Sequence, residues 1–515
     1  MTSTKCPSLV ALYRIAQIRQ IETAAKESLP AGSLMRAAGK AAAEFAKKLI
    51  RAPNEKILVL AGPGDNGGDA LEAAQLLASA GFQITIILCD VNSQYSIDAQ
   101  QSLQSAQASR ATFIDIEHFL NGDKEQWGLV IDGIFGIGLT RAISGTIASL
   151  TQRVNQLSQK YRIPVLALDV PSGLNADTGQ PTGEVAILAS HTITFIGNKP
   201  GLHTAAGRDY SGQVEVADLA ISSNFFPKPS AFLTHPQMFA HLLKPRLNDS
   251  HKGSYGDVMI IGGAAGMAGA PILAARSAIH CGAGRVFIGF IGTPVMFDNQ
   301  HPELMCRNAK DLDFSRSVVV IGPGLGTSDE AKQVLSKALD DAQAMVIDAD
   351  ALNLIALDAT LQNQLSARHE KNLATIMTPH PLEAARLLAV STKEIQADRL
   401  NSAQSLANKF KSSVILKGAG TVIATLNGTI YINTTGNPAL ATAGTGDVLA
   451  GVCGALLAQA ASASDAASFA VWLHGLAADN LVDQRIGTIG LTASELIPAI
   501  RFCLNTFVAV SNGRN

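Results

Sequence analysis

Short runs of β-branched residues alternate with longer, alanine-rich helical patterns along the whole chain. Strands of a parallel sheet are buried on both faces and are joined by helices that cross over the sheet, which produces this alternation. We therefore expect an α/β fold. The expected strands are 56–60, 84–88, 129–132, 165–169 and 192–196 in the first half and 258–261, 286–289, 318–321, 345–348, 414–417 and 421–425 in the second, with helices at 69–80, 151–161, 448–457 and from 464 onward.

The length of the chain indicates two domains, because 515 residues exceed what one ordinary hydrophobic core contains. Residues 222–236 contain three prolines among polar residues, which is typical of an extended linker. We expect a first domain at 1–222, a linker at 223–235 and a second domain at 236–515.

The composition indicates a protein that buries many hydrophobic side chains and carries little net charge. Hydrophobic residues make up 47% of the chain, charged residues 16%, and the formal net charge is −2, which gives no electrostatic argument for nucleic acid or a membrane as partner. No secretory signal is apparent, and the most apolar stretch, 448–461, is too short to span a bilayer. The cysteines form no C-x-x-C pair, so reduced thiols of a cytoplasmic protein are expected. They are Cys6, Cys89, Cys281, Cys306, Cys453 and Cys503.

The stretch Ala443-Gly444-Thr445-Gly446-Asp447 directly precedes the expected buried helix 448–457. The first N–H groups of a helix have no partner inside it, and together with the helix dipole they favour an anion such as phosphate. A carboxylate at Asp447 is unfavourable there unless it transfers a proton or faces a metal. The alternative is an ordinary first-turn aspartate. The motif predicts a polyphosphate site with its own acid or base.

Three expected strands of the first half end in polar loops, at 61–69, 133–141 and 170–173. Ligands bind at the carboxyl ends of the strands in such sheets. The side chains of Asn66, Asp132 and Ser172 offer the oxygens that a hard cation prefers, which leaves Asp169 as an acid or base. The alternative is that these loops are structural turns, in which the acidic side chains only bind nearby backbone amides.

The first half contains, in this order, Gly-Pro-Gly-Asp-Asn-Gly-Gly-Asp at 62–69, Asp-Gly-Ile-Phe-Gly-Ile-Gly-Leu-Thr-Arg at 132–141 and Asp-Val-Pro-Ser-Gly at 169–173. Over about residues 10–220 this resembles the NAD(P)H-hydrate epimerase family. The resemblance implies a Rossmann-like three-layer domain with a parallel sheet, a catalytic carboxylate at Asp169, and K⁺ bound by Asn66, Asp132 and Ser172. Contacts to the hydrated dinucleotide are implied for Asp65, Asn66, Gly67, Gly68, Asp69, Gly136, Ile137, Gly138, Leu139, Thr140, Arg141 and Ala142.

The first half departs from the family's pattern at two places. Asp65 and Ala70 stand where Asn and Gly are common, and Arg36-Ala37 stands where Glu-Asn is common. Asp65 adds negative charge close to a phosphate-bearing ligand, which argues for a weaker affinity but not for another fold. A non-catalytic ligand- or RNA-binding module is a second hypothesis, against which the polar residues at the strand ends and the absence of an obvious basic stripe argue.

The second half carries several glycine-rich or polar motifs beside its expected strands. The turn Lys417–Thr421 can contact a nucleotide through backbone amides and the Lys417 side chain, although a plain hairpin is the alternative. His380 lies between two prolines, which restrict the loop, although His is also a common capping residue. The other motifs are His-Lys-Gly-Ser-Tyr-Gly at 251–256, Met-Ala-Gly-Ala-Pro at 267–271, Gly-Pro-Gly-Leu-Gly at 322–326 and Asp-Ala-Asp-Ala-Leu at 348–352.

These motifs together with Ala-Gly-Thr-Gly-Asp resemble the ribokinase-like superfamily and, within it, the ADP/ATP-dependent NAD(P)H-hydrate dehydratases, over about residues 236–505. The resemblance implies a ribokinase-like α/β/α domain with Mg²⁺, ADP as co-substrate and Asp447 as the base. Leu382 departs from the family's usual Gly, while Glu383 is retained. Contacts to the hydrate are implied for Ala270, Gly324 or Gly326, His380 and Asp447, and contacts to the adenine nucleotide for Lys417, Gly418, Ala419, Gly420, Thr421 and Gly446.

Both halves in this order resemble bifunctional enzymes that repair NAD(P)H hydrate. The expected function is epimerisation of the R and S hydrates and ADP-dependent dehydration of the S form, which gives AMP and phosphate. The alternative is a kinase for a vitamin precursor, with the first half as a regulatory ligand-binding domain. Relatives of the dehydratase often form tetramers, so a homo-oligomer is expected, and neither nucleic acid nor a membrane is expected as a partner.

Overall fold

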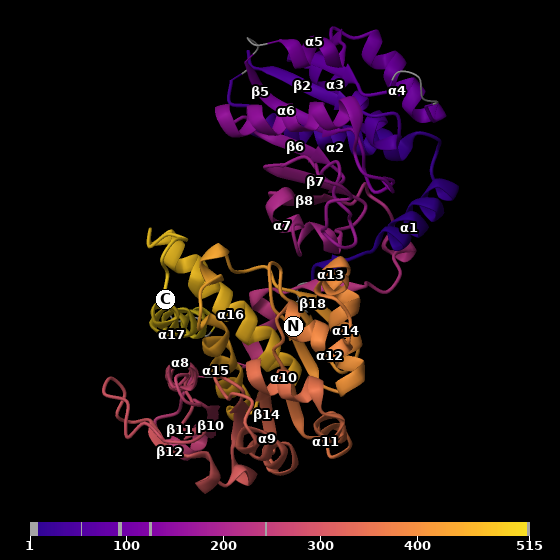
Figure 1. The fold of residues 1–515 in the computed structure, drawn as a ribbon. Coiled ribbons are helices and arrows are strands. Elements are labelled where there is room, and N and C mark those ends of the chain that lie inside the picture. The colour runs from indigo at the N-terminus through magenta and orange to yellow at the C-terminus, as the bar shows by residue number, and fades with distance from the viewer. Residues whose placement is uncertain (1–8, 53, 91–94, 123–125, 243–244, 512–515) are drawn as a thin grey trace. The chain divides into compact units, whose positions relative to one another are not determined.

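The computed structural model describes residues 9–52, 54–90, 95–122, 126–242 and 245–511 and contains two compact units (Figure 1). The first comprises Ala11–Ala231, and the second comprises the described residues from Phe232 onward together with Leu9 and Val10. Each unit has a mainly parallel sheet between two layers of helices, so the expected two-domain α/β fold class is confirmed. Cys6 lies outside the described residues; the other five cysteines are free thiols.

The N-terminal sheet is parallel throughout and has the order β4-β3-β2-β5-β6-β7-β8. Its register places Leu60 beside Asp132 and Asp132 beside Ala167, so the carboxyl ends of β2, β5 and β6 are neighbours. The strands are β2 (Lys56–Ala61), β3 (Gln83–Leu88), β4 (Thr112–Ile114), β5 (Trp127–Gly133), β6 (Val165–Leu168), β7 (His191–Phe195) and β8 (Gln213–Ala217).

Alternate residues of these strands face two separate hydrophobic clusters, because successive side chains of a strand point to opposite faces. Ile57 and Val59 pack with the helices of one layer, and Leu58 and Leu60 pack with those of the other. The first layer has α1 (Ile15–Ser28), α2 (Ser33–Leu49), α3 (Asp65–Ser79) and α4 (Ile97–Gln107); the second has α5 (Ile116–Asn121) and α6 (Gly145–Tyr161), and a short α7 (Gly207–Tyr210) precedes β8.

The start of α3 differs from the expected helix at 69–80. The helix begins at Asp65, so the glycine-rich stretch forms its first turns and not an open loop. Gly67 has a steric reason to be glycine, since a Cβ at this position would lie 1.8 Å from the carbonyl oxygen of Gly62. The expectation was wrong because glycine is a poor helix former, whereas this close approach requires it.

The C-terminal sheet has the order β9-β18-β17-β16-β15-β14-β13-β10-β11-β12. It is parallel except where β17 pairs antiparallel with β16 and β18, because the turn after β16 is too short for a crossover. The strands β9, β12, β15 and β18 of this sheet were not expected, and neither were β4 and β8 of the N-terminal sheet. The strands are β9 (Ala231–Leu233), β10 (Asp257–Gly262), β11 (Arg285–Phe290), β12 (Met305–Asn308), β13 (Val318–Ile321), β14 (Ala344–Ile347), β15 (Ala374–Met377), β16 (Ser413–Leu416), β17 (Val422–Ala424) and β18 (Ile430–Ile432).

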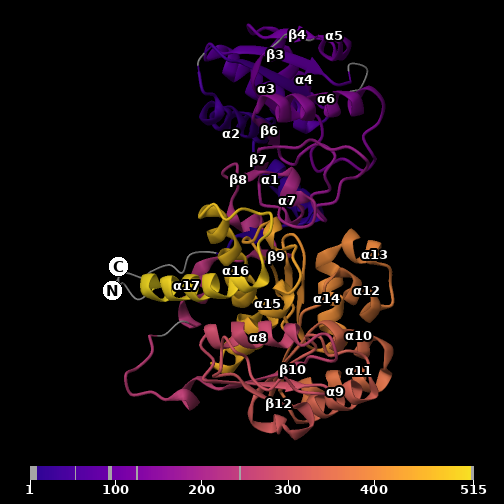
Figure 2. The ribbon, with the colours of Figure 1, turned by 60° about the vertical axis from the view of Figure 1, so that its left-hand side comes forward.

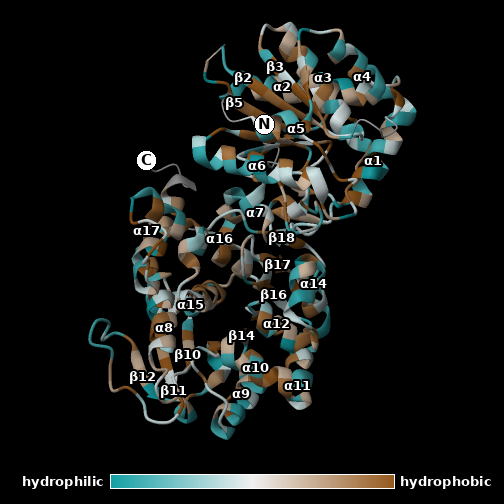
Figure 3. Cartoon of the chain, turned by 45° about the horizontal axis from the view of Figure 1, so that its top comes forward, coloured by the Kyte–Doolittle hydropathy of each residue, from teal (hydrophilic) through white to brown (hydrophobic). Residues whose placement is uncertain are grey.

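Two helix layers cover this sheet (Figure 2). Its central strands β13, β14 and β16 are buried except at Ala344, the first residue of β14. The strands and inward helix faces of both domains carry most of the hydrophobic colour in Figure 3. One layer has α8 (Gly269–His280), α15 (Thr445–Ala458), α16 (Ala463–Asp483) and α17 (Ala493–Ser511); the other has α9 (Asp329–Asp341), α10 (Ala349–Leu357), α11 (Ala359–Glu370), α12 (Pro381–Leu388), α13 (Thr392–Ala397) and α14 (Arg399–Phe410).

The stretch expected as a linker, 223–235, contains a 3₁₀ turn at Ser223–Phe225 and the strand β9. Near the N-terminus lies the two-residue strand β1 (Ala11–Leu12). None of the helices in the described part of the chain combines the length and apolar character needed to cross a membrane.

Candidate functional site

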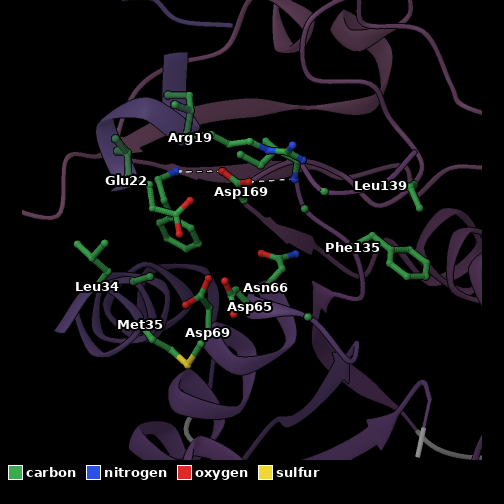
Figure 4. Close-up of a pocket in the computed structure, with 18 of the residues that line it drawn as sticks. Arg19, Glu22, Leu34, Met35, Asp65, Asn66, Asp69, Phe135, Leu139 and Asp169 are labelled. Carbon is green, nitrogen blue, oxygen red and sulfur yellow. Dashed lines mark hydrogen bonds between the residues drawn. The ribbon is translucent and has the colours of Figure 1, made fainter. Parts of the chain in front are cut away.

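The first candidate site is a cavity of about 500 Å³ in the N-terminal domain (Figure 4). It lies at the carboxyl ends of the parallel strands β2, β5, β6 and β7, which is the edge where ligands bind in such sheets. Helices α1 and α2 supply further wall residues. The wall includes ten of the residues predicted from the sequence, Asp65, Asn66, Asp69, Gly136, Ile137, Gly138, Leu139, Thr140, Arg141 and Asp169.

Three other predicted contact residues do not line this cavity. Gly67 and Gly68 lie inside α3, where Gly67 approaches Gly62 and Gly68 faces Met35. Ala142 lies against Gly183 instead. Their smallness serves packing in this structure, and their contact with substrate stays a prediction.

Asp169 follows β6 directly and is held in an unusual conformation. Its φ of 63° is uncommon for a residue with a side chain and is found where surrounding contacts impose it. The Nζ atom of Lys199 donates to Asp169 Oδ1 at 2.5 Å, and the amide of Ile137 donates to Oδ2 at 3.3 Å. Oδ1 of this carboxylate thus contacts a cation, whereas Oδ2 contacts Ile137, which lines the cavity.

Lys199 is a site residue that the sequence motifs did not predict. Its side chain is fully buried and also donates to Thr194 Oγ1 and to the carbonyl of Phe195. Burial lowers the pKa of the Lys199 ammonium, and the neighbouring Asp169 opposes this change. A lysine in the stretch Asn198-Lys199-Pro200-Gly201 is typical of a solvated loop. The one feature of the sequence that indicated a role in the site was its position shortly after an expected strand.

Asp69 is the second carboxyl of the cavity that is almost completely buried, with 9% of its surface exposed. Burial raises its pKa well above the usual value, and the charges of Asp169, Asp65 and Glu22 raise it further. Among the described residues, its side chain has no hydrogen-bond partner. A neutral carboxyl on the wall is therefore the form that this environment favours.

The three residues predicted to bind a cation meet around the loop that follows β5. Both oxygens of Asp132 are used, one by the amide of Ser172 at 2.8 Å and the other by its hydroxyl at 2.6 Å. Burial raises the pKa of Asp132 to about 6. The amide group of Asn66 is buried without a hydrogen-bond partner and lies beside Gly136, since a Cβ there would be 3.3 Å from Asn66 Cγ.

The second candidate site surrounds the first turn of α15, as the motif at 443–447 predicted. Gly444 precedes the helix with a φ of 89°, and Asp447 lies in its first turn. The amides of Gly446 and Asp447 are among those that have no partner within a helix. Burial and the charge of Asp348 raise the pKa of Asp447 to about 7, although Lys417 opposes the shift. This is the range in which a general base works at neutral pH.

Lys417 lies at the end of β16 within a group of acids. Its Nζ atom is 2.8 Å from Asp348 Oδ1 and 4.0 Å from Glu383 Oε2. Burial alone would lower the pKa of Lys417, but the two carboxylates raise it. The Cβ that Gly446 lacks would lie 3.5 Å from Nζ, so Lys417 is placed directly beside the start of α15.

A buried arginine, Arg399, stabilises the turn that is predicted to contact a nucleotide, Lys417–Thr421. The guanidinium of Arg399 donates to the carbonyls of Leu416 and Lys417 at 3.0 and 3.2 Å. A Cβ at Gly418, whose φ is 137°, would lie 3.0 Å from this guanidinium. Arg399 was not found from the sequence, because its helix gives no hint of where its side chain points.

Among the predicted hydrate contacts of this domain, Ala270 lies beside Gly324, whereas Gly326 contacts Asp350. Ala270 and Gly324 are neighbours, since a Cβ at Gly324 would lie 3.3 Å from that of Ala270. The amide of Gly326 donates to Asp350 at 2.9 Å, and Asp350 contributes to the raised pKa of Asp447.

His380 has a structural role in addition to any contact with substrate. Its ring accepts hydrogen bonds from the amides of Leu382 and Glu383 and thereby caps α12. Its other ring nitrogen lies 3.1 Å from Glu383. The capping alternative therefore holds for His380, and its role in substrate binding stays a prediction.

Two family models match the chain. The model described as YjeF-related protein N-terminus matches residues 31–201, and the model described as NAD(P)H-hydrate dehydratase matches residues 258–501. A solved ADP/ATP-dependent NAD(P)H-hydrate dehydratase from Bacillus subtilis, co-crystallised with ATP and Mg²⁺, is 29% identical, over 53% of this chain and 98% of that one, with a TM-score of 0.46.

Curated relatives match over the full length as well as over the second half. The bifunctional NAD(P)H-hydrate repair enzyme Nnr of Coxiella burnetii is 37% identical over 511 residues, which cover 96% of this chain and 100% of the relative. The ADP-dependent (S)-NAD(P)H-hydrate dehydratase of Neisseria meningitidis is 42% identical over 273 residues, 52% of this chain and 91% of the relative. The resemblance inferred from the motifs of both halves is confirmed, and the chain belongs to the family of bifunctional NAD(P)H-hydrate repair enzymes.

Proposed function

We propose that the N-terminal cavity interconverts the R and S epimers of NAD(P)H hydrate and that the C-terminal site dehydrates the S epimer with ADP. The observation that carries the proposal is the same in both domains: an acid predicted from the sequence lies at a strand or helix end beside a lysine, which is fully buried at Lys199 and partly buried at Lys417. Asp169 is bound to Lys199, and Asp447 interacts with Lys417, which lies against its helix turn.

In the C-terminal site, Asp447 accepts the proton of the hydroxyl on the reduced nicotinamide ring. The hydroxyl oxygen then attacks the terminal phosphorus of ADP, and AMP departs. The phosphate that is now on the ring leaves with the electron pair of the carbon–oxygen bond, as the lone pair of the ring nitrogen forms a carbon–nitrogen double bond. The neighbouring ring carbon then loses a proton to the departing phosphate or to water, which forms the ring carbon–carbon double bond and restores the neutral ring. The amides of Gly446 and Asp447 and the ammonium of Lys417 stabilise the charge on the transferring group. Catalysis of this kind consists mainly of positioning and charge stabilisation.

The products test this function against that of a kinase. The full chain receives a mixture of hydrate epimers, ADP and Mg²⁺, and we expect AMP, inorganic phosphate and restored absorbance of the reduced cofactor in equal amounts. A stable phosphorylated product without restored absorbance would identify a small-molecule kinase instead. ADP enters this reaction as its Mg²⁺ complex, because Mg²⁺ is commonly held by substrate phosphates and few protein ligands.

The dehydration rate is expected to depend on the ionisation of Asp447. Since burial raises the pKa of this carboxyl to about 7 and a base must be ionised to accept a proton, kcat falls as the pH decreases below about 7, by up to tenfold per pH unit. At higher pH the rate is constant. Measurement of kcat between about pH 5.5 and 8.5 with saturating ADP checks this. A rate that is flat across this range would contradict the assignment of Asp447 as base.

We also propose K⁺ as the cation of the N-terminal site, and the residues present fit it. The buried amide oxygen of Asn66 has no partner, and a carboxylate, a hydroxyl and a backbone carbonyl lie around the same loop, from Asp132, Ser172 and Phe135. Oxygen ligands of this kind suit hard cations. When bound, K⁺ would supply positive charge at the wall of the cavity.

Potassium is expected to stabilise the N-terminal domain specifically. The chain has two tryptophans, Trp127 and Trp472, so in a Trp472→Phe background the fluorescence of Trp127 reports on this domain. At about ten times its Kd, K⁺ should raise the free energy of unfolding by about 1.4 kcal/mol over the same concentration of Li⁺. Asn66→Ala should abolish this difference, and Asn121→Ala, at an exposed helix end, should keep it. A K⁺ effect that survives in Asn66→Ala would contradict the site.

A cytoplasmic location and a homo-oligomeric state complete the proposal. Free cysteines support a reducing compartment. Analytical ultracentrifugation of the full chain tests the assembly, for which a tetramer is expected.

A further inference from the structure

The proposed epimerisation, on which this inference rests, sets a requirement for the cavity. The reacting carbon carries a hydroxyl and lies next to the ring nitrogen. If the hydroxyl leaves on one face of the ring and water adds to the other, the departing oxygen needs a proton and the incoming water must lose one. One acid and one base must therefore stand on different sides of the ring.

Asp69 and Asp169 stand on different sides of the cavity (Figure 4). Asp169 reaches it from the end of β6, and Asp69 reaches it from α3, four residues after the helix begins. Both residues line the cavity, and each is more than nine-tenths buried as a whole residue. A flat ring between them would present one face to each.

The two carboxyls differ in their partners, and this difference assigns their roles. Asp169 accepts from the ammonium of Lys199 and from backbone amides, so both of its oxygens act as acceptors. The side chain of Asp69 has no hydrogen-bond partner among the described residues, although a buried carboxylate with a structural role would need one. Environments that separate two carboxyls in this way define the acid and the base of a pair.

The other charges around Asp69 support a neutral carboxyl. Helix α1 brings Glu22 and Lys26, α3 brings Asp65, and the end of β6 brings Asp169; of these only Lys26 favours ionisation, and it is 2.6 Å from Glu22. The remaining charged wall residues are Arg19, Asp98 and Arg141.

We propose that Asp69 is a second catalytic residue, which donates the proton to the departing hydroxyl while Asp169 receives the proton of the incoming water. The carbon–oxygen bond breaks as the lone pair of the ring nitrogen forms a carbon–nitrogen double bond, and water leaves with the proton of Asp69. A water molecule then adds to the opposite face and gives one proton to Asp169. The product is the other epimer, and the reverse reaction or exchange with solvent restores both carboxyls.

The test uses the full chain without adenine nucleotide, so that the dehydratase does not consume the hydrate. One purified epimer is added in H₂¹⁸O, and chromatography with mass spectrometry follows inversion and oxygen uptake. We expect Asp69→Asn to lower kcat by about 10²-fold or more with little change in KM. Glu72→Gln, which makes the same change one turn later on α3 and outside the cavity, should retain the kcat of the unsubstituted chain. In that chain each inversion should incorporate one solvent oxygen.

Stability separates a catalytic from a structural role. Since the pKa of Asp69 is raised on folding, its contribution to stability decreases as the pH rises above the unfolded pKa, and Asp69→Asn should be at least as stable as the original at pH 8. A large loss of stability, a kcat above one third of the original, or inversion without ¹⁸O uptake would overturn the proposal. Absence of inversion in the unsubstituted chain would instead overturn the proposed epimerase function, and with it this inference.

Discussion

Asp447→Asn is expected to lower kcat for ADP-dependent dehydration by about 10²–10⁴-fold. An amide cannot accept the proton of the hydroxyl, whereas it preserves the shape of the side chain in the first turn of α15. KM for the hydrate and for ADP should change only a few-fold, because the amides of Gly446 and Asp447 and the side chain of Lys417 remain. Restored cofactor absorbance, measured with purified S hydrate, ADP and Mg²⁺, gives the rate.

Two controls make this result specific to the proposed chemistry. Epimerisation by Asp447→Asn should equal that of the unsubstituted chain, since the two sites lie in separate domains. Asp341→Asn, which removes an exposed carboxylate of α9, should leave dehydration unchanged. Dehydration that persists in Asp447→Asn at more than a tenth of the original kcat would contradict the role of Asp447 as base.

Most of the fold could be predicted because burial of the strands leaves a clear trace in the sequence. Runs such as 57–60 and 318–321 are apolar on both faces, and the helices between them are long enough to be recognised. The strand β15 lacks this trace, since Ala374 and Thr375 begin it and Met377 ends it. The hydroxyl of the buried Thr375 accepts a hydrogen bond from Arg368 Nε, a contact that the local pattern does not reveal.

Residues of the candidate sites could be predicted where they belong to a local sequence motif, and were missed where their contacts lie far away in the chain. Residues that act through backbone amides or sit in glycine-rich turns, such as Gly444 and Gly418, belong to compact local motifs. Lys199 and Arg399 bind groups that are 30 and 17 residues away in the chain, so their roles depend on the tertiary fold. That Asp69 has no hydrogen-bond partner in the described part of the chain is likewise a property of the folded cavity and not of the motif that contains it.

Lysine 199 therefore has consequences for both stability and catalysis that no local motif indicates. Lys199→Met is expected to lower the free energy of unfolding of the N-terminal domain by about 3–5 kcal/mol, because it leaves the carboxylate of Asp169 buried without its cation. Epimerisation should fall by about 10²-fold or more, since Asp169 loses the contact that fixes its orientation and charge. Denaturant unfolding in the Trp472→Phe background, followed through Trp127, gives the stability, and the nucleotide-free assay gives the rate.

A second substitution distinguishes the loss of an ion pair from the loss of packing. Lys199→Met with Asp169→Asn removes both charges of this pair, so most of the lost stability should return, whereas epimerisation should not. Lys48→Met, which breaks the exposed pair with Glu215, should change stability by less than about 1 kcal/mol. If the double variant is no more stable than Lys199→Met, the lost stability does not come from an uncompensated carboxylate at Asp169, and Asp169 does not depend on a buried cation.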